Sequence, residues 1–542
     1  MAEQFCTPLN LDQIERNFAE INPAMSSPEA LVEANRCLYC YDAPCMHACP
    51  THIDVPGFIK KIASGNLIGS ARVIFDANPI GATCARVCPV EVLCEGACVE
   101  KTLLQKPIEI GRLQRYATDH ALTSDKQIFT KGESNGKSVG IVGSGPAGLS
   151  CASYLARLGY DVTVYEQKEK AGGLDTYGMA EYKMPQSVSL SEVERIAAMG
   201  VKFVLNTRVG SESHTPSEIA AEVAPAIQNP KSKIQNGIGS PPSEGGVDAV
   251  SADGVVLSSA AGQTVSFSDL DSWHDAIFLG VGLGETNRLG IPGEDSDGVY
   301  DALAFIEKIK TREWKSVPLG KTVAVIGAGN TAIDAVTQAK RLGAEKVVMV
   351  YRRTEKDASA YAYEMELARK DGVEFAWQAA PVGILAGENG SRLSLRCERT
   401  DGSLELFDIP CDMIIKAVGQ QKMRGFFESV AGVSIDEKGR VVVNENLQTS
   451  NPKIFSGGDC ANGGAEAVDA AQMGKLAARG IHFSLSGENV AFAGIIYPKI
   501  FSGGDCANGG AEAVDAAQMG KLAARGIHFS LSGENVAFAG II

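Results

Sequence analysis

The sequence predicts an α/β fold in which two parallel-sheet domains follow a smaller α-helical domain. Residues 138–166 and 321–353 each have the pattern of strand, glycine-rich turn, helix and second strand. That unit is typical of Rossmann-like dinucleotide-binding domains. The third observation is a group of eight cysteines within residues 37–98, in a stretch that otherwise has the pattern of short helices and polar loops. We therefore expect two Rossmann-like domains preceded by an α-helical domain that binds a metal or redox centre.

Length and composition exclude several classes of protein. The chain has 542 residues, of which 45% are apolar and 21% charged, which indicates three or four globular domains. Its formal charge of -15 argues against binding to nucleic acids or anionic membranes. No apolar run approaches the roughly 18 residues of a membrane span, and the start MAEQFCTPLN lacks the features of a signal peptide. We expect a soluble cytoplasmic protein whose thiols stay reduced.

The cysteines form two sets. In CLYCYDAPCMHACP the gaps are two, four and three residues and a proline follows, and the second set lies in GATCARVCPVEVLCEGACVE. The first spacing is close to the bacterial iron–sulfur run, whose fourth cysteine binds a different cluster from the first three. Structural zinc is less favoured because it usually uses two CxxC pairs, and disulfides need an oxidising compartment. The sets are Cys37, Cys40, Cys45 and Cys49, then Cys84, Cys88, Cys94 and Cys98.

The first glycine-rich turn meets both requirements for a dinucleotide site. It follows an apolar strand and opens a helix, and Glu166 ends the second strand about twenty residues later. The turn would let backbone N–H groups approach a pyrophosphate at the helix N-terminus, and Glu166 could bind a ribose. The candidate binding residues of this turn are Gly143, Gly145, Pro146, Ala147 and Gly148.

The second turn has the GxGxxA form and a different end to its second strand. Arg352 and Arg353 stand where an acidic residue would bind the ribose of NADH. Because arginine can bind a 2′-phosphate, NADPH is favoured over NADH, although two arginines on a surface turn can also be simply solvated. The candidate binding residues of this turn are Gly327, Ala328, Gly329, Asn330 and Thr331.

Two segments interrupt this organisation. Residues 211–270 include a Pro-, Ser- and Gly-rich stretch that predicts a mobile surface insertion, in which GVVLSS and QTVSFSD could pair as a hairpin. Residues 452–496 recur unchanged at 498–542, separated only by Tyr497. Two identical copies indicate a recent duplication or an assembly error, because old repeats differ at surface positions and a solenoid needs three or more units.

The motifs CLYCYDAPCMHACP, NPIGATCARVCP and IGRLQRY resemble the two-cluster domain shared by dihydropyrimidine dehydrogenases and the glutamate synthase small subunit. The likeness covers nearly the whole chain, and Gln114 favours the pyrimidine branch over the glutamate synthase branch. It implies that Cys84 binds no iron. It also implies one [4Fe–4S] cluster held by Cys37, Cys40, Cys45 and Gln114, and a second held by Cys49, Cys88, Cys94 and Cys98.

Beyond the clusters, AGGLDTYGMAEYKMP resembles the segment of disulfide-reductase-like flavoproteins that lies along FAD. The resemblance implies FAD at the first turn and NAD(P)H at the second. It also implies that the helix beginning near residue 467 points its positive end at the flavin, and that IIKAVGQ leads back into the FAD domain. The further contacts carried over are Gly173, Leu174, Lys183, Val209, Gly419, Asp459, Ala467 and Val468.

The expected domains follow from these motifs. They are a helical [4Fe–4S] domain (1–120), a linker (121–137), an FAD domain in two parts (138–285 and 420–496), an NAD(P) domain (286–419) and the duplicate (498–542). Of the two copies, we expect the first to complete the FAD domain, with Asp459 rather than Asp505 at FAD. The second copy would then pack loosely or stay disordered.

Two dinucleotide sites imply hydride transfer from NADPH to flavin, which needs no catalytic acid or base side chain. Disulfide reductases pass electrons on through a redox cysteine pair, but the cysteines at 151, 397, 411 and 460 form no CxxC or CxxxxC. Electrons would then leave singly through the clusters to an FMN-containing partner. The favoured reading is the electron-input subunit of a bacterial-type dihydropyrimidine dehydrogenase. Alternatives are a glutamate synthase small subunit and a non-enzymatic iron–sulfur subunit with a spoiled flavin site.

Overall fold

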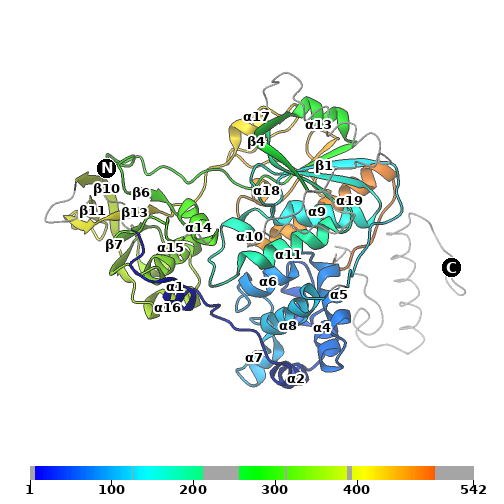
Figure 1. Cartoon of the computed structure of the whole chain (residues 1–542), viewed down its shortest axis with the longest axis horizontal. Helices are drawn as coiled ribbons and strands as arrows, with labels where there is room; N and C mark the ends of the chain where they lie inside the picture. The colour runs from blue at the N-terminus through cyan, green and yellow to red at the C-terminus, as the bar shows by residue number, and fades with distance from the viewer. Residues whose placement is uncertain (1–5, 125, 211–255, 312–313, 387–392, 495–542) are drawn as a thin grey trace, which may run out of the picture.

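The computed structural model describes residues 6–494, except 125, 211–255, 312–313 and 387–392. Figure 1 shows three lobes: a helical lobe lies below one α/β lobe, and a second α/β lobe lies to the side. The predicted insertion falls largely, and the second copy of the repeat wholly, outside the described residues. Within those ranges no helix is both long and apolar enough to cross a membrane.

The helical lobe is built from short helices around one apolar core that includes Phe58, Ile74 and Leu113. Polar caps fix where several of these helices begin; Asp54 and Asn66, for example, accept hydrogen bonds from the first turns of α4 and α5. The second helix is capped by Ser26, one residue before the serine in its first position. The elements are α2 (Ser27–Arg36), α3 (Pro44–His47), α4 (Val55–Ala63), α5 (Leu67–Ala77), α6 (Gly81–Val87), α7 (Val99–Leu103) and α8 (Ile110–Leu122).

The first α/β lobe contains a six-stranded sheet of order β14-β5-β1-β2-β3-β4, all of whose pairs are parallel. The expected hairpin at the end of the insertion is wrong. Its two segments belong to one strand, β4, which pairs parallel with β3, and to the helix that follows. The elements are β1 (Ser138–Val142), α9 (Pro146–Arg157), β2 (Asp161–Tyr165), α10 (Leu174–Tyr177), α11 (Gln186–Ala197), β3 (Lys202–Gly210), β4 (Val256–Ser266), α13 (Phe267–Trp273) and β5 (Ala276–Leu279).

The second α/β lobe repeats the plan with a five-stranded parallel sheet of order β6-β13-β7-β8-β9 and an antiparallel three-stranded sheet, β10-β11-β12. Continuous apolar runs in the central strands β7, β8 and β13 are buried on both faces of the sheet, as parallel sheets require. The elements are β6 (Val299–Asp301), α14 (Ala302–Lys310), β7 (Thr322–Ile326), α15 (Asn330–Arg341), β8 (Lys346–Val350), η1 (Glu355–Asp357), α16 (Ala362–Lys370), β9 (Glu374–Ala376), β10 (Ala379–Ala386), β11 (Leu393–Arg399), β12 (Leu406–Cys411) and β13 (Met413–Lys416).

The chain then returns to the first lobe through α17 (Arg424–Glu428), β14 (Ile454–Ser456), α18 (Asp459–Asn462) and α19 (Ala467–Ser486). The first copy of the repeat therefore supplies the edge strand β14 and the helix α19, which lies beside α9 (Figure 1). The two helices approach closely because Gly474 has no side chain. A Cβ there would lie 2.1 Å from the carbonyl oxygen of Ala147.

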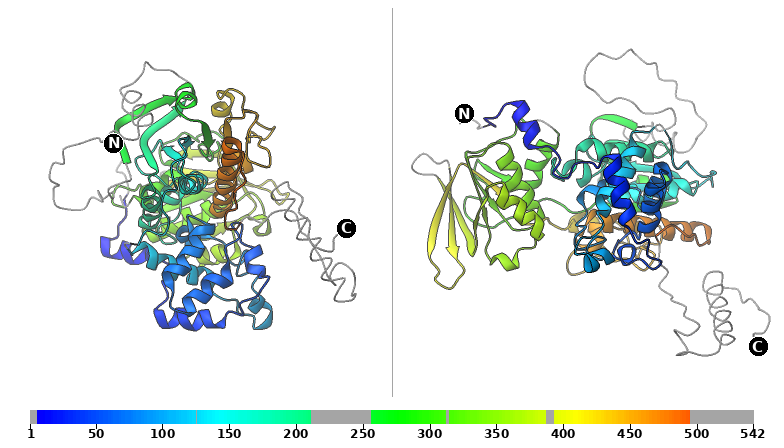
Figure 2. Two further views of the ribbon diagram at one scale, coloured as in Figure 1. Left: turned by 90° about the vertical axis from the view of Figure 1, so that its right-hand side faces the viewer. Right: turned by 90° about the horizontal axis from the view of Figure 1, so that it is seen from below.

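The N-terminal helix α1 (Leu11–Asn17) lies on the second α/β lobe and not on the helical lobe (Figure 2). Ile14 and Phe18 are buried in the core of that lobe, and the rings of Phe18 and Trp314 are 5.7 Å apart. A few residues later, Glu20 forms ion pairs with Arg86 and Arg115 of the helical lobe. The segment therefore ties two lobes together, and the first residues of the expected helical domain lie elsewhere in space.

Candidate functional site: a dinucleotide cavity beside two cysteine groups

The first glycine-rich turn joins β1 to α9 and needs glycine at two positions for different reasons. Gly143 has φ +94°, and a Cβ on it would lie 2.6 Å from the carbonyl oxygen of Gly280. At Gly148 a Cβ would lie 2.0 Å from the carbonyl oxygen of Gly143, so this residue lets the helix pack on the turn. By contrast, a Cβ on Gly145 would meet nothing within 4 Å. The turn thus leaves open space at the N-terminus of α9.

That open space belongs to a cavity of about 990 Å³. The size lies at the upper end of the usual range for ligand pockets, as an extended dinucleotide requires. The cavity reaches from the first turn to α14 in the second α/β lobe, where the N-cap Asp301 and Glu307 of the helix line it. Of the residues predicted from the sequence, those that line it are Gly143, Gly145, Pro146, Ala147, Glu166, Gly173, Leu174, Val209, Asp459 and Ala467.

Glu166 is 7% exposed and ties the turn to the end of β2. One carboxylate oxygen accepts hydrogen bonds from the backbone N–H of Ser144 at 3.1 Å and from its hydroxyl at 2.6 Å. The other accepts from the backbone N–H of Lys168 at 2.9 Å. The carboxylate therefore fixes the shape of the cavity wall, in addition to the ribose contact expected of it.

Three residues predicted for this site do not line the cavity. Gly148 lies beneath the turn and Val468 in the core of the lobe. Lys183 lies at the contact between the two α/β lobes, where its ammonium is 2.6 Å from both Asp334 and Glu364. In this position Lys183 joins the two lobes, and it could contact FAD only if its ion pairs with Asp334 and Glu364 were broken.

The second glycine-rich turn joins β7 to α15 in the other lobe. Gly327 has φ +136°, and a Cβ there would lie 2.2 Å from the carbonyl oxygen of Ala417. None of the predicted residues 327–331 lines the large cavity, and neither does Gly419, although its neighbour Gln420 does. Arg352 and Arg353 are exposed, and no ion pair to either is found among the described residues. Both side chains are therefore available to an anionic ligand.

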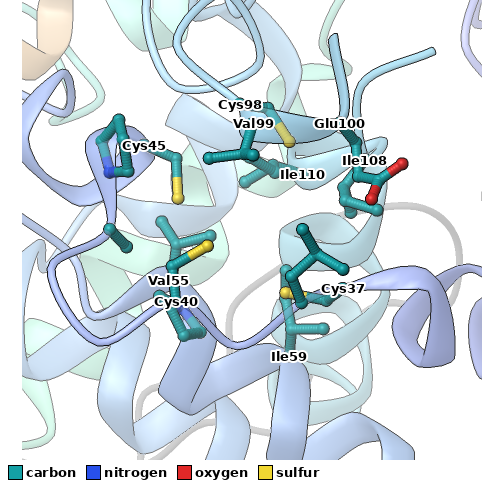
Figure 3. A pocket seen from close by; sticks show the side chains of 14 residues that line it. Cys37, Cys40, Cys45, Val55, Ile59, Cys98, Val99, Glu100, Ile108 and Ile110 are labelled. Atoms are coloured by element: carbon teal, nitrogen blue, oxygen red, sulfur yellow. The ribbon is translucent and has the colours of Figure 1, made fainter. Parts of the chain in front are cut away.

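Four cysteines of the helical lobe surround one hollow, and they are not the four grouped from the sequence. Figure 3 shows the sulfur atoms of Cys37, Cys40, Cys45 and Cys98 around a common space with apolar walls that include Val55 and Ile110. Burial, followed by the nearby Cys98, Cys37 and Cys40, raises the pKa of the Cys45 thiol to about 12.

The structure therefore places Cys98 with the first set instead of the second, and Gln114, predicted for the first set, does not line this hollow. The physical reason is the fold: Cys98 caps α7 and is carried back over the loop of Cys37–Cys45, while Gln114 lies within α8, which packs on α6.

Of the remaining predicted ligands, Cys88 packs against the core of the first α/β lobe, whereas Cys49 and Cys94 pack in the core of the helical lobe. A hydrogen bond with Cys84, burial, and then the nearby Cys49 and Cys94 raise the pKa of Cys88 well above its ordinary value. A Cβ on Gly111 of α8 would lie 3.2 Å from Val90 in the Cys88–Cys94 loop, and Gln114, one turn later, donates to the Gly81 carbonyl at 2.7 Å. Cys84 is buried and its sulfur accepts from the Asn78 amide at 3.1 Å.

The cysteine groups suit a cluster better than a single ion. The four sulfur atoms of the first group surround a hollow instead of meeting at one point. A zinc site would need thiolates about 2.3 Å from a common centre, whereas each thiolate of a [4Fe–4S] cluster binds a different iron. Every described cysteine is a free thiol, so the ligands are not consumed by disulfides.

Two models of known protein families match this chain, one over each part of the arrangement described above. The model for "Pyridine nucleotide-disulphide oxidoreductase" matches residues 137–474. The chain belongs to this family. In front of that region, the model for "Dihydroprymidine dehydrogenase domain II, 4Fe-4S cluster" matches residues 14–126.

Relatives match over most of their own length. The small chain of glutamate synthase [NADPH] of Escherichia coli (strain K12) is 32% identical over 88% of this chain and 95% of that protein. The NAD-dependent dihydropyrimidine dehydrogenase subunit PreT of the same organism is 31% identical over 86% of this chain and 97% of that protein. The putative oxidoreductase AegA of the same strain is 31% identical over 87% of this chain and 68% of that protein.

These matches confirm several predictions: the fold class, the family resemblance, the oxidoreductase activity and the cofactor classes, namely FAD, NAD(P)H and [4Fe–4S] clusters. Sequence reasoning missed part of the cavity wall, including Thr207, Gly282 and Gly457. The sequence did contain a signal for Gly282. It lies in the glycine-rich run LGVGLG, which follows a buried strand, and glycine-rich runs at the carboxyl end of a parallel sheet often contact a ligand.

Proposed function

We propose that this chain is the electron-input subunit of a dihydropyrimidine dehydrogenase, which passes electrons from NADPH to an FMN-containing partner that reduces uracil or thymine. One observation carries the electron-input role. Cys84 is part of the same apolar core as Ala147 of α9 and Ala470 of α19, both of which line the cavity, and Cys88 packs against that core. The second cysteine group and the dinucleotide cavity therefore share one rigid wall.

The cofactors supply the redox chemistry, hydride acceptance at FAD and single-electron transfer at the clusters. The protein supplies position. The N-terminus of α9 faces the expected pyrophosphate, and that of α19 lies at the cavity through Ala467. These helix ends favour negative charge in the cavity. No described side chain is needed as an acid or base.

We assign the ligands by the geometry of the thiols. One cluster would be held by Cys37, Cys40, Cys45 and Cys98, which surround the hollow in Figure 3. The other would be held by Cys49, Cys88 and Cys94, with Gln114 as the fourth ligand from the adjoining turn of α8. The second cluster is then next to the FAD lobe and the first is farther out, so electrons would leave through the first.

The exit would be a surface around the first group, and exposed apolar side chains there support a protein partner. Leu38 and Tyr41 lie in the Cys37–Cys45 loop and are 51% and 104% exposed. Leu103 and Leu104 end α7, which begins directly after Cys98, and are 62% and 67% exposed. Apolar and aromatic side chains are the usual anchors of interfaces.

We expect Tyr41→Asp with Leu104→Asp to weaken binding of the FMN subunit at least tenfold, because each buries a charge in the interface. Binding would be measured by sedimentation of the mixed subunits, with iron content as a check on the clusters. Leu406→Asp is the matched control, since Leu406 is 58% exposed but lies in the NAD(P) lobe. Equal weakening by the control would argue against this surface.

The exposed arginines at the end of β8 support NADPH as the donor. We expect the double variant Arg352→Ala, Arg353→Ala to raise the KM for NADPH at least tenfold, because charge-assisted bonds to a 2′-phosphate are lost. The KM for NADH should change little. Steady-state kinetics with an artificial acceptor measures both, and equal changes would show that the arginines are solvated surface.

Glutamate synthase small chain is the second candidate, favoured by the 32% identity noted above. Reconstitution separates the two. The chain would be mixed anaerobically with a dihydropyrimidine dehydrogenase FMN subunit or with a glutamate synthase large subunit, and NADPH oxidation would be followed. Oxidation that depends on uracil supports the proposal, and oxidation that depends on glutamine and 2-oxoglutarate overturns it.

A further inference from the structure

A buried lysine from the flavin lobe enters the helical lobe next to the second cysteine group. Lys475 of α19 is 0% exposed. Its ammonium donates to three backbone carbonyls, those of Thr51 at 3.0 Å, Ala77 at 2.8 Å and Ala493 at 3.0 Å. Three acceptors match the three donors of an ammonium group. The nitrogen is thus held at one place.

No ion pair of Lys475 occurs among the described residues. A buried ammonium without a paired carboxylate is costly, so its retention needs a reason. Burial lowers the pKa of Lys475 to about 7, and the proximity of Cys49 and Asp76 opposes that shift. An anionic centre at Cys49 would supply the missing partner charge.

The contacts of Thr51 connect the lysine to Cys49. The Thr51 carbonyl accepts from Lys475, and the Thr51 hydroxyl lies 3.4 Å from the sulfur of Cys49. The same helix begins at the dinucleotide cavity with Ala467 and reaches Lys475 about two turns later. One rigid element therefore spans the flavin site and the second cysteine group.

We infer that Lys475 sets the reduction potential of the cluster that Cys49 would hold. The inference rests on the proposed function, because it requires that cluster. When the cluster gains one electron from the flavin side, its net charge becomes more negative by one and no bond to Lys475 forms or breaks. A fixed positive charge nearby stabilises the reduced form, which raises the potential and favours electron entry. Lys475 is thus a positioning residue and not a catalytic one.

The test is a redox titration of the full chain with reconstituted clusters, monitored by EPR. In Lys475→Gln, which keeps two N–H donors but no charge, the ratio of reduced to oxidised second cluster at fixed potential should fall about tenfold. That corresponds to a shift of about 59 mV for one electron. Lys475→Arg keeps the charge and should keep the wild-type potential. The potential of the first cluster serves as an internal reference.

Lys310→Met is the matched control. Lys310 is also fully buried and donates to a carbonyl, that of Met184, but it belongs to α14 in the NAD(P) lobe. Its replacement should leave both cluster potentials unchanged. An unshifted potential in Lys475→Gln, or a shift of equal size in Lys475→Arg, overturns the inference. If Lys475→Gln loses its clusters, Lys475→Arg decides alone, and a lowered potential of its second cluster overturns the inference. Wild-type protein without two cluster signals would instead overturn the proposed function.

Discussion

Cys98→Ser should abolish the cluster near the surface and leave the cluster beside the flavin lobe in place. The reason is the hollow in which Cys98 faces Cys37, Cys40 and Cys45. The iron content should fall from about eight atoms per chain to about four, since each cluster contributes four. NADPH should still reduce the flavin and the remaining cluster, while electron delivery to a partner should fall by several orders of magnitude, because its exit is lost. EPR of the reduced protein identifies which signal disappears.

The variant Gln114→Ala should affect the other cluster, the one beside the flavin lobe. If Gln114 is the fourth ligand of the group at Cys49, Cys88 and Cys94, its loss perturbs the inner cluster signal and spares the outer one. The grouping drawn from sequence resemblance demands the reverse result for both variants. A single pair of spectra therefore decides between the two ligand sets.

The first glycine-rich turn offers a second large effect, in which two neighbouring glycines should behave differently. Gly148→Ala places a methyl group 2.0 Å from the carbonyl oxygen of Gly143. Because that atom is backbone, the turn itself must shift, and we expect a loss of more than about 4 kcal/mol in the free energy of unfolding. Gly145→Ala puts its methyl into open space at an ordinary φ of -66°.

Gly145→Ala should therefore leave the flavin-free protein as stable as wild type and yet lower the flavin content at least tenfold, because a bound pyrophosphate would occupy that space. Chemical denaturation of flavin-free protein and absorbance of bound flavin measure the two properties separately. Full flavin content in Gly145→Ala would show that no ligand approaches this turn. Unchanged stability in Gly148→Ala would show that the turn is not closely packed.

The sequence alone predicted those features of the protein that are formed by residues close together in the chain. A glycine turn between a buried strand and a helix needs only about ten residues, and its chemistry is carried by backbone N–H groups. The sequence therefore predicted both Rossmann-like units, their order and ten of the residues that line the cavity. It also predicted that cysteines of the helical lobe, rather than a redox cysteine pair at the flavin, receive the electrons.

The positions of residues far apart in the chain were decided by tertiary structure alone. The family resemblance grouped Cys98 with Cys49, Cys88 and Cys94, but the cap of α7 carries it to the loop of Cys37–Cys45. Helix α1 was assigned to the lobe that follows it, yet Phe18 packs against Trp314 of the NAD(P) lobe. Lys183 was expected at FAD and instead meets two carboxylates of that lobe.

Lys475 shows the same limit most clearly. In sequence it is a lysine in an amphipathic helix, which indicates a solvated side chain. Only the packing of α19 between two lobes brings it to the carbonyls of Thr51, Ala77 and Ala493. Local pattern determines which elements form because it depends on neighbouring residues. The partner of a buried charge depends on which surfaces exclude water together, and that is settled only when the lobes pack.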